Sequence, residues 1–585
     1  MYFHVLRGLG TVLGSHVNGQ LAIAPSSSPQ HTRPLPLPSA RRFLVSLPLP
    51  DHPPLQRPVQ TMGDTLVCTS VTASTAVAVL ADFHKAAAAG ADLVELRVDL
   101  LDAGEDWEHP LSASPLPVIV TNRAAWEGGQ CTLPEADRLA TLVRAEAAGA
   151  AFVDVELAAA APFQAARASS GAPPSRGGGK GGACRLILSH HNFERPLTHD
   201  EASKVYADAV AAGADIVKVA MAATSAADVG VVFDLLSAAK VPTIALAMGA
   251  HGVISRILTP KYGGFLTFTC VAAGAESAPG QLDTATLLSA YPFRSITPAT
   301  AVYGVIGCPI GHSMSPALHN AALSAAAIDA VYVPLLVDGG DLDRFLTAVR
   351  PHGFVGFSVT LPHKLDALAA CGDAVDPVAA RIGAVNTLVA DDGGPLGYRG
   401  YNTDWTGALD AVEARRTVRD ASVMVLGAGG AGRALAFGAV ARGAGLVIIV
   451  NRSGDKARAL AAELRTPTCP TVATTPDAAT DLPFVAGVDI VMNSTSVGMH
   501  PGVDATPVDA ALFVDRGAPL VFDAVYNPLE TRLLREAAAA GCVTVSGVEM
   551  FVRQAAAQFQ LWFPERTPDV GLMREVVLAA LAKKK

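Results

Sequence analysis

Lys218 is the residue whose position most directly suggests chemistry, because it interrupts the largely apolar segment Ala214–Ala220. Burial disfavours the charged form of an amine, and an uncharged amine can attack a carbonyl carbon to form an imine. A lone buried lysine is as often a paired structural charge. The chemical interpretation of Lys218 therefore depends on the residues that accompany it.

Other titratable residues lie within or directly after the neighbouring apolar segments. Glu95, Arg97 and Asp99 alternate along one segment, so a strand there would point all three towards the same face. The others are Arg123 with Glu127, His190 with His191, and Arg256. Successive strand residues face opposite ways, so only one of the two histidines can enter a common site. Several such groups around one lysine favour a reactive site over isolated structural charges.

A second set of polar residues begins after residue 300 and includes Lys364 and Asp404. A positioned lysine can give a proton to an oxygen that becomes negative during a reaction, and a neighbouring carboxylate favours its charged form. Taken singly, these could be turn, cap or surface residues. The other members carry hydroxyl and amide groups that can hydrogen-bond a small polar ligand: Ser313, Ser315, Thr360 and Asn386.

A glycine-rich turn follows the short apolar segment Ser422–Leu426 and precedes an alanine-rich helical segment. It consists of Gly427, Ala428, Gly429, Gly430, Ala431 and Gly432. Between a strand and a helix, these glycines let the backbone approach a pyrophosphate at the helix N-terminus. The next predicted strand ends in Asn451, Arg452 and Ser453, with Lys456 one turn later, where NAD-binding chains carry an acidic residue. Cations here favour NADP over NAD, although a helix start with surface charges is the plainer alternative.

Apolar runs of strand length alternate with helical segments through the first half of the chain. Eight of them within about 220 residues predict a (β/α)8 barrel, whose chemistry belongs at the C-terminal ends of the strands. The runs are Leu66–Thr72, Leu93–Leu100, Pro117–Thr121, Phe152–Glu156, Arg185–Ser189, Asp215–Val219, Pro242–Ala247 and Phe265–Val271. The predicted barrel spans residues 63–285 and contains a flexible, low-complexity insertion at 168–183.

The second half predicts a two-domain α/β unit after a junction near Leu282–Thr297. A ligand-binding domain spans 298–410 and is completed by C-terminal helices within 545–580. A nucleotide-binding Rossmann domain spans 415–544.

Bulk composition excludes several classes of protein. The net charge of −9 provides no basic field for nucleic acid. Eight scattered cysteines without a CxxC pair argue against a disulfide framework or a structural zinc site, and no His or carboxylate cluster has metal-ligand spacing. No apolar run reaches the roughly 18 residues of a membrane span. The fused architecture favours a monomer.

Residues 1–62 have the composition of a targeting segment. No Asp or Glu occurs before Asp51, whereas arginines are interspersed with serine and proline. This pattern predicts an organellar transit peptide, and the alternatives are an ordinary disordered tail or a mispredicted start of the chain.

The barrel segment resembles the type I 3-dehydroquinate dehydratases over about residues 64–285. The motifs that carry the resemblance are ELRVD (Glu95–Asp99), NRAAWEGG (Asn122–Gly129), SHHNF (Ser189–Phe193), DIVKVA (Asp215–Ala220), GVISR (Gly252–Arg256) and SAPGQ (Ser277–Gln281).

The resemblance implies that Lys218 forms a Schiff base with a ring ketone. His191 would move the proton and Glu127 would orient His191. Arg256 would clamp the substrate carboxylate. The resemblance also implies a set of residues that hydrogen-bond the ring hydroxyls of the substrate or cover the pocket. These are Glu95, Arg97, Arg123, Ser277 and Gln281.

Residues 300–578 resemble the shikimate dehydrogenases, and the whole chain resembles the plant-type fused enzymes. The supporting motifs are YGVIGCPIGHSMSPALHN (Tyr303–Asn320), FSVTLPHK (Phe357–Lys364), NSTSVGM (Asn493–Met499), FDAVYNP (Phe522–Pro528) and GVEMFVRQAAAQF (Gly547–Phe559). Ser358 stands where many bacterial relatives have asparagine.

The second resemblance implies reduction of 3-dehydroshikimate with NADPH, with Lys364 as proton donor beside Asp404. Substrate contacts would come from Ser313, Ser315, Thr360, Asn386, Tyr526, Gln554 and Gln558. Cofactor contacts beyond the glycine turn and the Asn451–Lys456 stretch would come from Thr495, Met499 and Gly547.

Two alternatives remain open at this point. The first is a quinate dehydrogenase of the same fold, although such enzymes tend to lose the second serine of the SxS pair and Ser315 is retained. The second is a catalytically silent binding protein, although Lys218, His191, Lys364 and Asp404 are all present.

Overall fold

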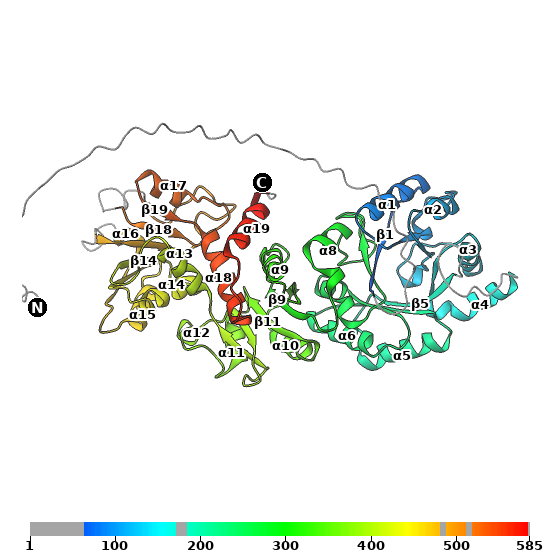
Figure 1. Ribbon diagram of the computed structural model, residues 1–585, viewed down its shortest axis with the longest axis horizontal. Coiled ribbons are helices and arrows are strands. Elements are labelled where there is room, and N and C mark those ends of the chain that lie inside the picture. Colours follow the sequence, from blue (N-terminus) through cyan, green and yellow to red (C-terminus); the bar gives the residue numbers. More distant parts are fainter. Residues whose placement is uncertain (1–63, 171–183, 480–486, 510–517, 583–585) are drawn as a thin grey trace, which may run out of the picture. The chain divides into compact units, whose positions relative to one another are not determined.

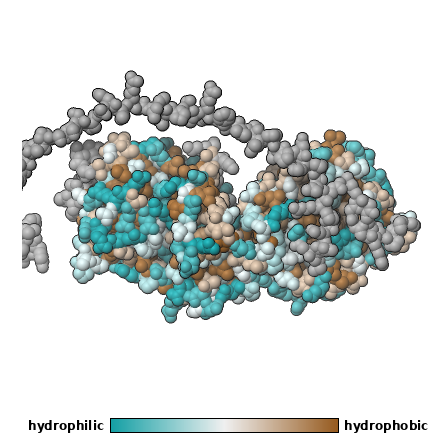
Figure 2. Space-filling view, in the orientation of Figure 1, coloured by the Kyte–Doolittle hydropathy of each residue, from teal (hydrophilic) through white to brown (hydrophobic). Residues whose placement is uncertain are grey.

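The computed structural model describes residues 64–170, 184–479, 487–509 and 518–582 (Figure 1). The predicted transit peptide at 1–62 lies outside these residues, as does most of the predicted insertion at 168–183. No helix within the described ranges is long and apolar enough to cross a membrane. On the face shown in Figure 2, hydrophilic and hydrophobic residues are interspersed over the described surface, as is usual for a solvated protein.

The first sheet contains eight parallel strands in the order β7-β6-β5-β4-β3-β2-β1-β8, which confirms the predicted barrel. The N–H of Phe265, just before β8, donates to the carbonyl of Thr243 in β7 at 2.8 Å, so the two edges meet and the barrel is nearly closed. The strands are β1 Leu66–Val71, β2 Leu93–Arg97, β3 Val118–Thr121, β4 Phe152–Glu156, β5 Arg185–Asn192, β6 Ile216–Ala222, β7 Thr243–Met248 and β8 Leu266–Cys270.

Helices follow the strands and cover the outside of the barrel. They are α1 Ala76–Ala88, α2 Glu108–Ala113, α3 Glu135–Ala147, α4 Ala160–Ser169, α5 His199–Ala211, α6 Val229–Ala238, α7 Val253–Ile257 and α8 Thr284–Ala290. Helix α5 begins with a reciprocal capping box, in which Thr198 accepts from the N–H of Glu201 and Glu201 accepts from that of Thr198. The predicted junction at Leu282–Thr297 thus contains α8.

The two-residue period of the strands decides which side chains enter the barrel. Ile216 and Ala220 of β6 belong to the apolar cluster inside it, together with Phe268 of β8. Lys218 lies between them on the same strand, so it also points inward.

Strand β2 is shorter than its apolar pattern predicted. It ends at Arg97 and continues as a 3-10 turn, η1, at Val98–Leu100. Asp99 therefore leaves the strand alternation, and its carboxylate accepts from the backbone N–H groups of Arg123 and Gln130. The expectation that Glu95, Arg97 and Asp99 share one strand face is wrong for Asp99.

The second sheet has the order β10-β9-β11-β12-β13, in which β12 is antiparallel to both of its neighbours. Its strands are β9 Ala301–Gly307, β10 Ala330–Leu336, β11 Phe354–Val359, β12 Thr387–Ala390 and β13 Tyr398–Tyr401. The associated helices are α9 Ser315–Ala325, α10 Leu342–Val349, α11 Lys364–Cys371, α12 Pro377–Ile382 and α13 Asp404–Glu413. The C-terminal helices α18 Gly547–Trp562 and α19 Val570–Ala582 pack against this sheet through a shared apolar cluster.

The third sheet is fully parallel, in the order β16-β15-β14-β17-β18-β19 expected of a Rossmann domain. Its strands are β14 Ser422–Leu426, β15 Leu446–Val450, β16 Thr471–Thr474, β17 Ile490–Asn493, β18 Leu520–Asp523 and β19 Val543–Val545. Its helices are α14 Gly430–Ala441, α15 Gly454–Leu464, α16 Pro476–Ala479 and α17 Arg532–Ala539. The predicted fold class, a barrel joined to a two-domain unit with a Rossmann domain, is confirmed.

Candidate active sites

A cavity opens inside the barrel at the C-terminal ends of its strands, where Lys218 lies. Lys218 is only 5% exposed, and its Nζ lies 2.7 Å from Oδ2 of Asp154 and 4.5 Å from the ring centroid of Phe268. The cavity is lined by all nine residues that the sequence assigned to the first site: Glu95, Arg97, Arg123, Glu127, His191, Lys218, Arg256, Ser277 and Gln281.

Asp154, which the sequence analysis did not single out, is the direct partner of Lys218. It is fully buried on β4, and its Oδ1 accepts hydrogen bonds from Arg123 at 2.7 Å and from the Ser189 hydroxyl at 2.6 Å. Burial alone would raise the pKa of Asp154, but the cations of Arg123 and Lys218 hold it well below its usual value. The lysine is therefore matched by a permanent carboxylate instead of standing alone among apolar groups.

A signal for Asp154 is present in the sequence. Asp154 and Glu156 alternate in FVDVE, the fourth apolar run, as Glu95 and Arg97 do in the second. The reasoning that applies to a charge inside a strand at Lys218 applies equally to these two carboxylates.

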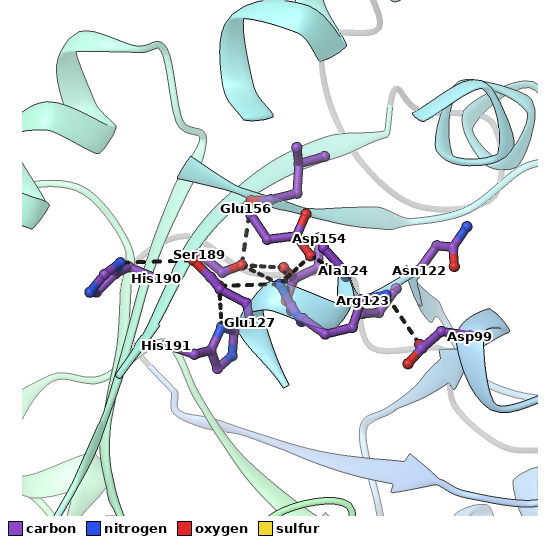
Figure 3. A network of polar contacts seen from close by, with 12 residues as sticks. Asp99, Asn122, Arg123, Ala124, Glu127, Asp154, Glu156, Ser189, His190 and His191 are labelled. Carbon is purple, nitrogen blue, oxygen red and sulfur yellow. Dashed lines mark hydrogen bonds and ion pairs between the residues drawn. The ribbon is translucent and has the colours of Figure 1, made fainter. Parts of the chain in front are cut away.

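Arg123 links the acidic residues of the cavity, as Figure 3 shows. Its guanidinium contacts Asp154 at 2.7 Å, Glu156 at 3.0 Å and Glu127 at 3.8 Å. Burial opposes its charge, but the neighbouring carboxylates raise the pKa of Arg123 above its ordinary value. The guanidinium of Arg123 is thus already paired with carboxylates of the protein, and its first role is to hold these carboxylates in place.

His191 and Glu127 form a close pair at the end of β5. Nδ1 of His191 lies 2.8 Å from Oε2 of Glu127. Burial, and after it the cations of Arg123 and Lys218, lower the pKa of His191 well below its usual value, so the imidazole is neutral. Burial also raises the pKa of Glu127 to about 8, with Arg123 opposing and the carboxylates of Glu156 and Asp154 reinforcing the shift. A neutral base thus sits beside a carboxyl group that titrates near neutrality.

The two consecutive histidines differ in their surroundings. The side chain of His191 is 10% exposed and lines the cavity, whereas that of His190 is 32% exposed and lies outside its lining. Nδ1 of His190 is 3.8 Å from Glu127, beyond hydrogen-bond distance. This geometry favours His191 as the base.

Arg256 on α7 is a buried cation without an anionic partner among the described residues. Its Nε makes no hydrogen bond, and its two Nη atoms reach only the carbonyls of Phe268 and Pro279, at 3.5 and 3.3 Å. Burial lowers its pKa to about 10. An unbalanced guanidinium in a cavity wall is suited to bind a carboxylate ligand.

The remaining cavity residues are held by hydrogen bonds to the protein. Glu95 accepts from the hydroxyls of Ser70 at 2.5 Å and Thr121 at 2.8 Å. Gln281 donates to the Ser277 hydroxyl at 3.0 Å and accepts from the Ser277 N–H at 2.9 Å. These contacts fix the polar atoms that a bound ring would meet.

A second constellation lies where α11, α13 and α18 meet. Nζ of Lys364, the first residue of α11, lies 2.5 Å from Oδ2 of Asp404, the first residue of α13. Asn386 donates to the other carboxylate oxygen of Asp404 at 2.9 Å, and Oε1 of Gln554 lies 3.5 Å from the same amide nitrogen. A half-exposed ammonium held by a carboxylate can deliver a proton to a bound ligand.

Other residues assigned to this site lie less close. The Ser313 hydroxyl accepts from the N–H of Ser315 at 3.3 Å, and Thr360 follows β11. Tyr526 is 40% exposed and stacks on Phe551 with ring centroids 5.4 Å apart. Within the described ranges, no hydrogen bond joins Ser313, Thr360 or Tyr526 to the Lys364/Asp404 pair. Gln558, by contrast, is buried and donates to the carbonyl of Asn386 at 3.2 Å.

The glycine turn between β14 and α14 has the features of a phosphate-binding loop. Gly427 has φ of +107°, and a Cβ on Gly432 would lie 2.1 Å from the carbonyl oxygen of Gly427, so both positions require glycine. Gly429, Gly430 and Ala431 are exposed, and no side chain caps the first turn of α14. The N-terminus of α14 is thus open to an anion.

Cationic residues follow the adjacent strand β15. Asn451 accepts from the N–H of Ala428 at 3.2 Å, which ties this strand end to the glycine turn. Arg452, Ser453 and Lys456 are exposed, and neither Arg452 nor Lys456 makes an ion pair within the described part of the chain. Unpaired cations at this strand end suit a 2′-phosphate. These residues fit an NADP group.

Three further residues assigned to the cofactor differ in setting. Thr495 hydrogen-bonds Asn493 at 2.7 Å, and Met499 is exposed. Gly547 begins α18, where a Cβ would lie 2.5 Å from the carbonyl oxygen of Ala524. Close backbone packing therefore requires glycine at 547 irrespective of any cofactor.

Comparison with protein-family models gives four matches along the chain. A model described as type I 3-dehydroquinase matches residues 67–298, and the shikimate dehydrogenase substrate binding domain matches 305–388. The shikimate/quinate 5-dehydrogenase model matches 410–525, and the shikimate 5'-dehydrogenase C-terminal domain matches 547–578.

Individual relatives agree with these matches. The chain is 42% identical over 519 residues to a chloroplastic bifunctional 3-dehydroquinate dehydratase/shikimate dehydrogenase of Arabidopsis thaliana, which covers 85% of this chain and 82% of the relative. It is 43% identical to an NADP(+) shikimate dehydrogenase of Methanosarcina acetivorans over 48% of this chain and 98% of the relative. A solved shikimate dehydrogenase in complex with NADP+ aligns with a TM-score of 0.44 at 36% identity, covering 49% of this chain and 97% of that one.

Proposed function

The chain belongs to the family of bifunctional 3-dehydroquinate dehydratase/shikimate dehydrogenases, and we propose that its barrel cavity and its Lys364 site perform these two steps in turn. The barrel dehydrates 3-dehydroquinate to 3-dehydroshikimate, and the C-terminal half reduces the product to shikimate with NADPH. The observation that best supports the first step is the buried Lys218–Asp154 pair in a cavity that also contains the unpaired Arg256.

Lys218 is the nucleophile of the proposed dehydration. Its nitrogen gives up one proton to attack the ring ketone as an amine and a second after the C–N bond has formed; the ketone oxygen takes up two protons and leaves as water, so an iminium links lysine and substrate. The iminium nitrogen carries a positive charge at the place where the ammonium stood, 2.7 Å from Asp154. Because this carboxylate stays ionised, it balances the charge before and after the covalent step.

His191 is the proton carrier of the same reaction. The iminium stabilises the carbanion that forms when His191 removes a proton from C2, and the histidine then returns a proton to the departing hydroxyl. Glu127 holds the imidazole at Nδ1, which leaves Nε2 for the substrate.

The dehydration rate should depend on the ionisation of Glu127. Below pH about 8 this residue is increasingly protonated, and it then no longer stabilises the imidazolium that His191 becomes. We expect kcat/KM to rise with pH and level off above about 8, and a Glu127→Gln protein to be slower and to lack this limb. A pH–rate profile tests this, with His190→Asn as the matched control that keeps the limb. An unchanged limb in Glu127→Gln would assign the titration to another group.

Replacing Arg256 should weaken substrate binding more than it affects folding. In Arg256→Gln we expect the KM for 3-dehydroquinate to rise about 10- to 100-fold, since charge-assisted hydrogen bonds contribute about 1.5–3 kcal/mol. The Tm should change little, because the lost cation has no ion-pair partner among the described residues. Arg185→Gln, at the opposite end of the barrel, is the matched control and should leave KM unaltered. An unaltered KM in Arg256→Gln would place the carboxylate elsewhere.

Lys364 is the proposed acid of the reduction. NADPH, when bound, supplies a hydride to the substrate ketone. The ammonium of Lys364 then gives its proton to the oxygen that becomes negative, and Asp404 holds it in place. Asn386 and Gln554 bind ring hydroxyls beside this pair, and Ser313, Ser315 and Thr360 extend the polar surface.

The cofactor is NADP. The residues proposed to bind it follow from the exposed N-terminus of α14 and from Arg452 and Lys456 after β15, which have no ion-pair partner among the described residues. Main-chain N–H groups of Gly429–Ala431 bind the pyrophosphate, and Arg452 with Lys456 binds the 2′-phosphate.

The N-terminal segment and the fusion of the two halves bear on the cellular location and assembly of the protein. An acid-poor N-terminal sixty residues and a chloroplastic relative support import into a plastid. Fusion of both halves supports action as a monomer, with 3-dehydroshikimate produced on the same chain that carries the second site.

One incubation tests the function as a whole. Purified chain with 3-dehydroquinate and NADPH should accumulate shikimate as NADPH absorbance falls, and NADH should serve less well. Parallel reactions that supply shikimate or quinate with NADP test the quinate dehydrogenase alternative, for which faster quinate turnover is required. No turnover by well-folded protein would overturn the proposal.

A further inference from the structure

A continuous line of hydrogen bonds runs through the second site to Asp404 and begins at a residue that neither activity has required so far, Tyr332 of β10. The Tyr332 hydroxyl lies 2.6 Å from the Ser358 hydroxyl, which lies 2.8 Å from Oε1 of Gln558. Gln558 donates to Thr387 at 3.1 Å, and Thr387 donates to Oδ1 of Asn386 at 2.8 Å. Asn386 then donates to Asp404, the partner of Lys364.

The chemistry of the groups fixes the direction of every bond in this line. Gln558 must turn its amide nitrogen towards the carbonyl oxygen of Asn386, since a carbonyl only accepts, and its Oε1 therefore faces Ser358. Ser358 must give its single proton to that oxygen, so it can only accept from Tyr332. The donor at the head of the line is thus the tyrosine hydroxyl.

The far end of the line is equally constrained. Oδ1 of Asn386 accepts from the backbone N–H of Thr403 at 2.7 Å, so its amide nitrogen must face the Asp404 carboxylate at 2.9 Å. These contacts set the orientation of the Asn386 amide. That amide in turn holds Asp404, and Asp404 holds Lys364.

Tyr332 is built to remain a neutral donor. It is fully buried, and its ring stacks on His319 with centroids 4.4 Å apart at 17°. Burial raises the pKa of Tyr332, and hydrogen bonds with Ser358 and Ser315 offset this only in part.

We propose that Tyr332 is a positioning residue of the reductase, which acts through Ser358, Gln558, Thr387 and Asn386 to hold the Lys364/Asp404 pair in its proton-delivering arrangement. This inference rests on the proposed reductase function of that pair. Loss of the hydroxyl leaves Ser358 without its donor, so the contact that holds Oε1 of Gln558 loosens. The amides of Gln558 and Asn386 keep their orientation through the backbone of Asn386 and Thr403, but they hold Asp404 less firmly. Tyr332 is fully buried, so it acts on the site through these residues.

Tyr398→Phe provides a matched control for Tyr332→Phe. Tyr398 is equally buried in the same sheet, but its hydroxyl donates to the backbone carbonyl of Phe354 at 3.0 Å and is not part of the line. Both changes remove one buried hydroxyl, so both should lower Tm to a similar extent. Turnover of 3-dehydroquinate by the barrel of each variant measures the amount of chain, and an unaltered KM for NADPH shows that the reductase half is folded.

The proposal predicts a loss of turnover in one variant alone. Tyr332→Phe should lower kcat for 3-dehydroshikimate about 3- to 10-fold, the range that corresponds to one buried hydrogen bond, with KM for NADPH unaltered. Tyr398→Phe should keep the wild-type kcat. The Tyr332→Phe/Ser358→Ala double variant should be no slower than Ser358→Ala within about 2-fold, because residues in one network are not additive.

Results that would contradict the positioning role can be told apart from results that would contradict the reductase function. Equal kcat in Tyr332→Phe and Tyr398→Phe, or fully multiplicative effects of Tyr332→Phe and Ser358→Ala, would overturn the positioning role while leaving the reductase function intact. Absence of reduction by the wild-type chain would overturn both.

Discussion

A Lys218→Ala protein should lose dehydration of 3-dehydroquinate by on the order of 10⁴- to 10⁶-fold, as enzymes do when a covalent nucleophile is removed. The covalent route is closed, because Lys218 is the one lysine among the described residues that lines the cavity. Reduction of supplied 3-dehydroshikimate should continue at the wild-type rate. Separate assays of the two steps on one preparation measure both effects.

Mass spectrometry tests the covalent premise directly. Borohydride added during turnover should trap the imine and raise the mass of the wild-type chain, but not that of Lys218→Ala. Lys261→Met is a matched control, because Lys261 is also a buried lysine of the barrel half but donates to the carbonyls of Pro298 and Thr300 instead of entering the cavity. Borohydride should raise the mass of the Lys261→Met chain as it does that of the wild-type chain. A wild-type chain of unaltered mass would remove the basis for a Schiff base.

The fold could be predicted from the sequence because its strands are read from local pattern. The run Phe152–Glu156 coincides with β4, and the other barrel strands differ by a few residues at their ends. The C-terminal ends of β2, β5 and β6 differ most, each by three residues. In β2 the apolar pattern continues to Leu100 but the chain turns after Arg97. After Arg97, the Asp99 carboxylate accepts hydrogen bonds from the backbone N–H groups of Arg123 and Gln130. Such a tertiary contact cannot be predicted from the periodicity of the sequence.

The sequence could predict those site residues whose burial is energetically unfavourable unless they have a partner or a function. A lysine inside a strand, or an arginine after one, attracts attention because burial of an isolated charge is unfavourable. Asp154 meets the same criterion, but its significance depends on its pairing with Lys218, 64 residues further along the chain. Tyr332 gave no signal, since a tyrosine in a strand is ordinary and only the buried line to Ser358 and Gln558 distinguishes it.

A Lys364→Ala protein should show the reverse of the Lys218 result. Loss of a positioned acid typically costs about 10²- to 10⁴-fold, so reduction of 3-dehydroshikimate should fall in this range while dehydration is unaffected. In the coupled incubation, 3-dehydroshikimate should accumulate. Lys456→Ala is the matched control: it removes a cation proposed for the 2′-phosphate, so it should raise KM for NADPH and leave kcat near the wild-type value.

Mixing the two inactive proteins separates a two-site enzyme from a single shared site. Lys364→Ala still makes 3-dehydroshikimate and Lys218→Ala still reduces it, so the mixture should form shikimate from 3-dehydroquinate although neither protein does so alone. The mixture requires the intermediate to diffuse between chains, so shikimate should appear after a lag that shortens as protein concentration rises. A mixture that forms none, while each variant retains its other activity, would mean that the intermediate never leaves the chain that made it. A mixture whose members both lack both activities would mean that the two lysines serve one site.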